Sequence, residues 1–167
     1  MSVVFDANIL IDLFNENLKG EKRTKLDFLV QNLIKSRTKV IIPTPSLTEL
    51  LVRADKARER YLQKISSTSA FSVAPFDSRA ALECSILLET AWSKSEQRKI
   101  SHSKFKFDWQ IVAIAASRGA TAIYSDDGDI ERAARHVQIP VYKTSVLPLP
   151  ESARQEEIVF DAHSDTE

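Results

Sequence analysis

The sequence predicts an α/β fold, a three-layer sandwich in which a central parallel sheet of four to five strands is flanked by helices. Short runs of β-branched and aromatic residues alternate with amphipathic segments along the chain, as they do in parallel sheets covered on both faces. The 167 residues, 43% of them apolar, suit one globular domain with a packed core. No internal repeat or membrane-length apolar run competes with this interpretation.

The N-terminal part of the chain is expected to form one strand and two helices. Val3–Phe5 is a short strand of buried type, and a helix follows over residues 8–14. The second helix is predicted by five apolar residues at the spacing of one helix face: Leu26, Leu29, Val30, Leu33 and Ile34. A strand followed directly by helices favours a sheet layer with a helical cover.

The next segment repeats the order of strand, helix and strand. Lys39 to Ile42 is a second strand, after which Thr44 is expected to cap a helix with Pro45 in its first turn. The charged residues that follow carry this helix to Lys64. A third strand is expected at Phe71–Ala74.

The remaining elements follow the same alternation. Residues 78–92 are helical by composition, and the polar residues 93–103 are expected to form a loop. A strongly periodic helix is predicted from Phe107 to Arg118 and ends at Gly119. The chain then gives a fourth strand, a short helix and a last extended piece: residues 121–124, residues 129–136, and the surroundings of Val141.

The charge is balanced overall but unevenly distributed. The chain has 23 basic and 23 acidic residues, and residues 151–167 hold six of the acids and one base. We therefore expect a domain at residues 1–147 and an acidic, mobile tail at residues 148–167. Two stretches hold much of the basic excess, residues 53–64 and 94–106, and such patches suit either a solvated surface or a polyanionic partner.

The cysteine and histidine content narrows the chemistry. The single cysteine, Cys84, excludes an internal disulfide and is expected to be a small buried apolar group. The first residues lack the basic segment of a secretory signal, so a cytoplasmic protein is expected. His102, His136 and His163 show no ligand spacing, and we interpret each as a surface or core residue.

Acidic residues follow several of the predicted strands. Asp6 comes directly after the first strand, and Asp126 and Asp127 come directly after the fourth. Glu49 lies in the second turn of the helix after the second strand, and Asp108 in the first turn of the helix beginning at Phe107. Because the carboxyl ends of parallel strands meet at one edge of the sheet, these acids are expected to lie together.

Each acid also has a structural interpretation when taken alone. Asp6, Asp108 and Asp127 could cap helices, and Glu49 could be a surface residue. If they converge, however, each pair at about 5 Å repels by about 3 kcal/mol at an effective dielectric constant near 20. Such a cluster requires a cation or proton uptake. Hard oxygen ligands suit Mg²⁺ or Mn²⁺, and such an ion supports phosphodiester hydrolysis without a serine or histidine nucleophile.

Four short motifs resemble those of the PIN-domain ribonucleases. They are FDANILI at residues 5–11, SLTEL at 46–50, FDWQIVA at 107–113 and YSDD at 124–127. The resemblance covers residues 3–145, and the chain length and single-domain layout are similar to those of the VapC-type toxins of bacterial toxin–antitoxin pairs. A PIN-like three-layer sandwich is the fold that this resemblance implies.

The resemblance implies a metal-dependent endoribonuclease that uses Mg²⁺ or Mn²⁺. It carries over four catalytic acids, of which all but the glutamate are implied metal ligands: Asp6, Glu49, Asp108 and Asp127. Asn8 and Ser125 would brace these carboxylates by hydrogen bonds. The family spacing selects Asp127 over its neighbour, and Asp126 and Asp129 are possible further acids.

The resemblance also implies partners: an RNA substrate, a small antitoxin that inserts into the site, and a second copy of the chain in a homodimer, with no membrane. Lys99, Lys104 and Lys106 are candidates for contacts to the RNA backbone. Trp109 is bulkier than the family residue that usually follows the third acid. It could stack on a base, but a buried helix aromatic is the expectation.

Two alternatives come from other classes of protein. A haloacid-dehalogenase-like phosphatase also has an Asp after its first strand, but it requires a second Asp at the position of Asn8 and a phosphate loop that this chain lacks. A non-catalytic RNA-binding or protein-binding domain could keep the fold without the chemistry, although all four acids are present.

Overall fold

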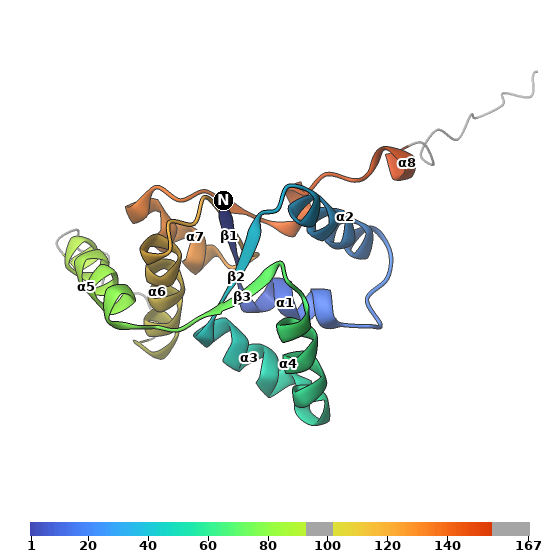
Figure 1. Ribbon diagram of the computed structural model, residues 1–167. Coiled ribbons are helices and arrows are strands. Elements are labelled where there is room, and N and C mark those ends of the chain that lie inside the picture. Colours follow the sequence, from blue (N-terminus) through green and yellow to red (C-terminus); the bar gives the residue numbers. More distant parts are fainter. Residues whose placement is uncertain (93–101, 155–167) are drawn as a thin grey trace, which may run out of the picture.

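A five-stranded parallel sheet forms the centre of the molecule, as the computed structural model of residues 1–92 and 102–154 shows (Figure 1). The strand order is β3-β2-β1-β4-β5, so β1 lies in the middle with β2 on one side and β4 on the other. The strands are β1 (Ser2–Phe5), β2 (Lys39–Pro43), β3 (Phe71–Ala74), β4 (Ile123–Tyr124) and β5 (Val141–Tyr142). The predicted sheet of parallel strands is confirmed.

Alternate residues of the central strands enter two separate hydrophobic cores. Val4 of β1 and Ile41 of β2 pack on one face, whereas their neighbours pack on the other. The residues of that second face are Val3, Phe5, Val40 and Ile42. Because side chains alternate along a strand and both faces are covered, the strands read as continuous apolar runs.

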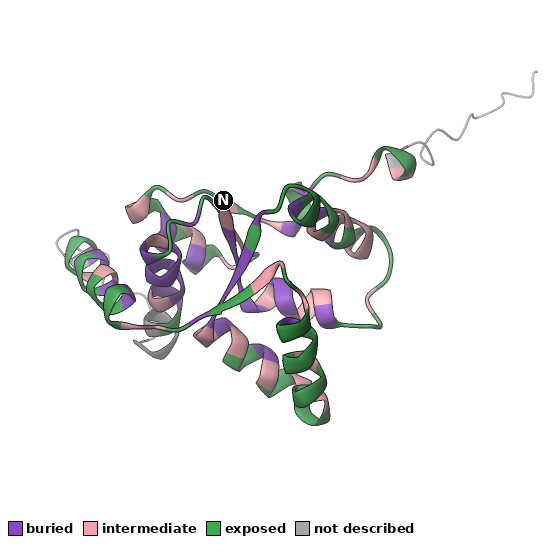
Figure 2. Ribbon diagram, viewed as in Figure 1, coloured by how far each residue is buried: buried purple, intermediate pink, exposed green. Residues whose placement is uncertain are grey.

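Helices cover both faces of the sheet and complete the three predicted layers (Figure 1). The face with Val4 is covered by α5 (Ser78–Trp92), α6 (His102–Ser117) and α7 (Gly128–Ala134). The other face is covered by α1 (Ala7–Phe14), α2 (Glu21–Lys35), α3 (Thr44–Ala54) and α4 (Arg58–Ser67). Figure 2 shows that α6 is largely buried over its described length while α4 is largely exposed.

The predicted helix from Thr44 to Lys64 is in fact two helices. The first, α3, ends at Ala54, and a short 3₁₀ turn over Asp55–Ala57 leads into α4. Asp55 has a φ of +45° and a ψ of −113°, a backbone conformation outside the helical regions, and it is the C-cap of α3. Thr44 is not the cap, because Pro43 occupies that position and the Thr44 hydroxyl accepts a hydrogen bond from the Phe76 backbone instead.

The helix predicted to begin at Phe107 begins five residues earlier, at His102. The expected loop at residues 93–103 therefore includes its first two residues, and residues 93–101 lie outside the described part of the chain. Polarity predicted the loop, but polarity is equally compatible with a solvent-facing helical turn. Asp108 consequently sits in the second turn of α6 rather than in the first.

Two predictions about individual side chains have different outcomes. Cys84 is buried in α5, and burial raises the pKa of its thiol, which confirms it as a small core group. In α2, Leu26, Leu29 and Leu33 are buried, but Ile34 is 50% exposed, so the apolar face is narrower than the spacing predicted.

A search of the described helices finds none with the length and apolarity required to cross a bilayer.

Arg23 of α2 holds the end of α1 in place. Its guanidinium donates hydrogen bonds to four backbone carbonyls, those of Asp12, Leu13, Asn15 and Leu18. The shortest of these, to the oxygen of Asn15, is 2.7 Å. Carbonyls at a helix C-terminus lack intrahelical partners, so the fork of Arg23 satisfies groups that water would otherwise have to solvate.

We expect Arg23→Lys to lower the free energy of unfolding by about 2 kcal/mol, because an ammonium group cannot reach several carbonyls at once. Urea unfolding followed by circular dichroism measures this loss. Arg135→Lys is the matched control, because the Arg135 side chain is 73% exposed and, among the described residues, pairs with Glu131, four residues earlier. Equal losses in the two variants would contradict the role given to Arg23.

Candidate active site

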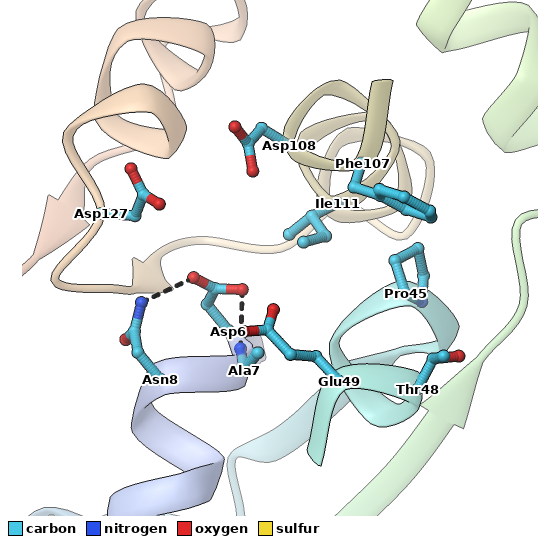
Figure 3. Close-up of a pocket in the computed structure, with 10 residues that line it drawn as sticks. All are labelled: Asp6, Ala7, Asn8, Pro45, Thr48, Glu49, Phe107, Asp108, Ile111 and Asp127. Carbon is cyan, nitrogen blue, oxygen red and sulfur yellow. Dashed lines mark hydrogen bonds between the residues drawn. The ribbon is translucent and has the colours of Figure 1, made fainter. Parts of the chain in front are cut away.

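A cavity of about 360 Å³ opens at the edge of the sheet where the strands end (Figure 3). Its walls come from the start of α1, from α3, from α6 and from the segment after β4. The residues that line it are Asp6, Ala7, Asn8, Pro45, Thr48, Glu49, Phe107, Asp108, Ile111 and Asp127. The structure thus brings the four predicted acids to a single pocket.

The position of the pocket follows from the strand order. From β1 the sheet grows through β2 in one direction and through β4 in the other. The segments leaving β1 and β4 therefore diverge, and a crevice forms between them at the switch point. Asp6 leaves β1 at this point, and Asp127 leaves the neighbouring β4.

Asp6 is held by four hydrogen bonds although it is only 5% exposed. Oδ1 accepts from the Ala7 backbone at 2.6 Å and from the Ser46 hydroxyl at 3.2 Å. Oδ2 accepts from Asn8 Nδ2 and from Ser125 Oγ, each at 2.8 Å. The carboxylate therefore has a fixed orientation, and the bond to Ala7 also makes it the N-cap of α1.

The electrostatic environment of Asp6 opposes its ionisation. Burial raises the pKa of this carboxyl above its usual range, and the nearby negative charge of Glu49 raises it further. The hydrogen bonds from Ser125, Ala7 and Ser46 lower the pKa but do not outweigh burial. The pocket therefore favours either a proton on Asp6 or a cation beside it.

Ser125 and Asn8 connect the carboxylate to the segment after β4. Ser125 Oγ accepts hydrogen bonds from Asn8 Nδ2 at 3.2 Å and from the Asp127 backbone at 3.0 Å. Asn8 Oδ1 accepts from the Asp126 backbone at 3.1 Å. The structure thus places both residues against Asp6, where the resemblance implied bracing groups.

The other three acids enter the pocket from different directions (Figure 3). Asp127 caps α7, because Oδ1 accepts the Asp129 backbone at 2.8 Å. Asp108 is 8% exposed and lies within α6, so the capping alternative does not apply to it. Glu49 is exposed, as its surface interpretation requires, yet its side chain points into the cavity.

Asp126 and Asp129 do not line the pocket, contrary to their expected role as further acids. The carboxylate of Asp126 accepts hydrogen bonds from the backbone and hydroxyl of Thr144, and Lys22 lies 3.6 Å from it. Asp129 forms an ion pair with Arg132 at 2.9 Å. These partners of the two side chains, Thr144, Lys22 and Arg132, also lie outside the pocket lining.

Ser46 is a site residue that sequence reasoning missed. It is fully buried in the first turn of α3 and donates to Asp6. It lies in the same short motif as Glu49, three residues earlier, so the signal was a hydroxyl within that motif. Its contribution is a donor that fixes the carboxylate from the α3 side.

Trp109 does not line the pocket. Trp109 is buried, as expected, and its ring lies 5.4 Å from that of His136, which acts as a packing partner. Lys99 lies outside the described residues, as do the side chains of Lys104 and Lys106.

The acids fit a hard cation by their chemistry but do not form a closed cage. Among the described side chains, no group of three or more acids, histidines or cysteines is close enough together to hold a metal ion. Mg²⁺ keeps several waters and is bound by one or two carboxylates together with substrate phosphates. An open, oxygen-lined pocket is compatible with that mode of binding.

A parallel sheet of this order with carboxylates gathered at its switch point defines an α/β protein with an acidic site of the kind used for metal-assisted hydrolysis. The PIN domain matches residues 3–136, so the chain belongs to the PIN domain family. The resemblance of the four motifs is thereby confirmed at the level of the family. No curated protein matches the sequence significantly.

Solved structures of toxin–antitoxin proteins share the fold. A chain of the promoter-DNA-bound VapBC2 complex of Rickettsia felis is 16% identical with a TM-score of 0.62, covering 86% of this chain and 98% of that one. A chain of the DNA-bound VapBC of Salmonella typhimurium is 18% identical with a TM-score of 0.60, and the match covers 86% of this chain and 98% of that one. The sarcin–ricin-loop-cleaving toxin VapC20 of Mycobacterium tuberculosis is 15% identical with a TM-score of 0.53, and the match covers 78% of this chain and 94% of that one. At these identities the likeness concerns the fold.

The raised pKa of Asp6 predicts how stability depends on pH without divalent ions. A raised pKa in the folded state contributes stability that is present below the ordinary aspartate pKa of 3.8 and is lost as the pH rises through the pKa of the folded state. The unfolding free energy of the wild type should therefore fall relative to that of Asp6→Asn as the pH rises from about 4.

Urea unfolding of both proteins in a chelator, over a series of pH values, measures this difference. If the unfolding free energy of the wild type minus that of Asp6→Asn stays constant or rises with pH, Asp6 ionises readily in the folded state.

Proposed function

We propose that this chain is a metal-dependent endoribonuclease that hydrolyses RNA phosphodiester bonds and acts as the toxin of a toxin–antitoxin pair. The observation that carries the proposal is the convergence of Asp6, Glu49, Asp108 and Asp127 on one pocket from four separate segments. Asp6 and Asp127 each also cap a helix, but gathering four acids in one pocket costs stability through their mutual repulsion. The four acids gain a function when a cation binds between them and neutralises their charge, so that a phosphate can bind as well.

Asp6, Asp108 and Asp127 would hold the ion, with Mg²⁺ or Mn²⁺ as the cations suited to their oxygens. When bound, such an ion supplies a water of lowered pKa and neutralises charge that develops on the phosphate. Asp6 would contribute a carboxylate whose direction is set by its four donors. Asp127 would contribute from the other side, fixed by its cap on α7.

Glu49 is suited to a different task. It is the exposed acid at the pocket, so its carboxylate can take the proton of an attacking water and pass it to solvent. Asn8, Ser46 and Ser125 would act by orienting Asp6. Loss of such a supporting group in metal sites lowers metal affinity or activity by roughly 10- to 100-fold.

The solved structures with this fold support the toxin assignment. One is a toxin that cleaves the sarcin–ricin loop, and two are VapBC complexes bound to DNA. By analogy we infer an RNA substrate and an antitoxin partner for this chain, and a cytoplasmic place of action. The homodimer implied by the resemblance stays a prediction.

Family membership removes one alternative and leaves the other. The chain belongs to the PIN domain family and not to the haloacid-dehalogenase-like phosphatases. Asn8, which stands where such a phosphatase requires its second Asp, donates a hydrogen bond to Asp6 and accepts one from the Asp126 backbone. A non-catalytic binding domain stays open as an outcome of the cleavage test.

We expect the purified protein to cut RNA when Mg²⁺ or Mn²⁺ is present and to stop when a chelator is added. Asp6→Asn should lower the rate by more than about 100-fold, and Ser125→Ala by roughly 10- to 100-fold. Asp55→Asn is the matched control, because Asp55 is exposed and lies outside the pocket, and the change removes a charge without changing the size of the side chain. RNA bound but uncut by the wild type would indicate the binding domain instead.

Expression of the chain without a partner should arrest bacterial growth, because unrestrained RNA hydrolysis stops protein synthesis. Asp6→Asn expressed to the same level should not arrest growth, and growth curves with matched immunoblots compare the two. Equal growth of both strains would remove the toxin assignment and leave the nuclease assignment standing.

A further inference from the structure

The pocket has an apolar side, away from Asp108 and Asp127. Phe107 and Pro45 lie together on one side in Figure 3, whereas Asp108 and Asp127 lie on the other. Phe107 and Asp108 are consecutive in α6, and successive residues of a helix are rotated by about 100°, so this helix presents an aromatic ring to one wall and a carboxylate to the other. The cavity is therefore divided by chemistry as well as by shape.

Phe107 differs from the other aromatic residues in its surroundings. Its side chain is 56% exposed, more than any other aromatic side chain in the described part of the chain. Several others pack against each other, as Phe5 does with Tyr124 and Phe14 with Tyr61. An exposed ring at the mouth of an acidic cavity contributes little to the core, which leaves its face available to a ligand.

We propose that Phe107, with Pro45 beside it, is a stacking platform for an unpaired base of the RNA next to the scissile phosphate. This rests on the proposed function and adds the form of the substrate and the residue that positions it. With a cation held by the acids, the phosphate of the RNA would lie beside them, and the base of an adjoining nucleotide would reach the apolar wall. Aromatic rings bind bases of single strands in this way because every base has a flat π face.

The size of the cavity favours a single strand. About 360 Å³ lies at the small end of ligand pockets, which suits one nucleotide and not a duplex. Bases within an RNA duplex are already stacked on their neighbours and cannot stack on a protein ring. Loops and unstructured segments are therefore the expected substrates. Trp109 cannot take this role, because it is buried against His136.

The first test compares variants of Phe107 on an unstructured RNA oligonucleotide whose cleavage site has been mapped. Phe107→Ala should raise KM by roughly 10- to 100-fold with a much smaller change in kcat. Phe107→Leu should raise KM nearly as much, because leucine has no flat ring on which a base can stack. Phe107→Tyr, which keeps the ring, should keep the wild-type KM. Leu82→Ala is the control, because Leu82 is 62% exposed on α5 and does not line the pocket. Equal KM values for the alanine, leucine and tyrosine variants would overturn the proposal.

The second test identifies the base by a double-mutant cycle between protein and RNA. Each nucleotide flanking the cleaved bond is replaced in turn by an abasic one. At the stacked position the loss should weaken binding to the wild type by roughly 10- to 100-fold and should have no further effect in Phe107→Ala. Losses that are the same in both proteins at every position would place the base elsewhere.

The outcomes distinguish a chain that is not a nuclease from a nuclease without a stacking platform. If the wild type cleaves no RNA, the proposed function fails and this inference fails with it. If it cleaves RNA but Phe107→Ala is unaffected, only the platform is overturned. If that variant keeps full cleavage and loses only the binding of a partner protein, Phe107 is a protein-docking residue and the proposal is wrong.

Discussion

The buried carboxylate of Asp6 is the constraint on which the arrangement of the site depends. A charge removed from water is costly unless it is hydrogen-bonded, and the four donors to Asp6 come from three parts of the fold. Ala7 and Asn8 belong to α1, Ser46 to α3, and Ser125 to the segment after β4. Satisfying one side chain therefore fixes the relative positions of the elements that form the pocket.

These donors do not remove the cost of the charge, and the remaining cost has a functional meaning. The pKa of Asp6 stays raised in spite of its hydrogen bonds, because burial and the charge of Glu49 outweigh them. A fold selected for stability alone would place an apolar or amide group there. Keeping a carboxylate at the switch point of the sheet makes sense when a cation offsets the charge during function, and stability is then exchanged for a prepared site.

The sequence predicted the parts of this structure that follow from local pattern. The strands, the parallel sheet and the convergence of Asp6 and Asp127 all follow from apolar runs that end in acids at one edge. The misses depend on contacts between distant residues. The motif spacing favoured Asp127 but left Asp126 as a possible further acid, and in the structure Asp126 bonds instead to Thr144, 18 residues away. The break at Asp55 and the donor role of Ser46 likewise depend on tertiary packing.

Phe107 shows the same limit from the side of function. Its position in the third motif, directly before Asp108, identified the acid and gave no reason to notice the ring. Trp109 is the aromatic residue that the sequence offers for stacking on a base, because it directly follows the acid. The helix places these two rings about 200° apart, so one must enter the core if the other faces the cavity. Local sequence alone cannot decide which, since the answer depends on where α5 and α7 cover α6, and the burial of Trp109 is what leaves Phe107 at the pocket.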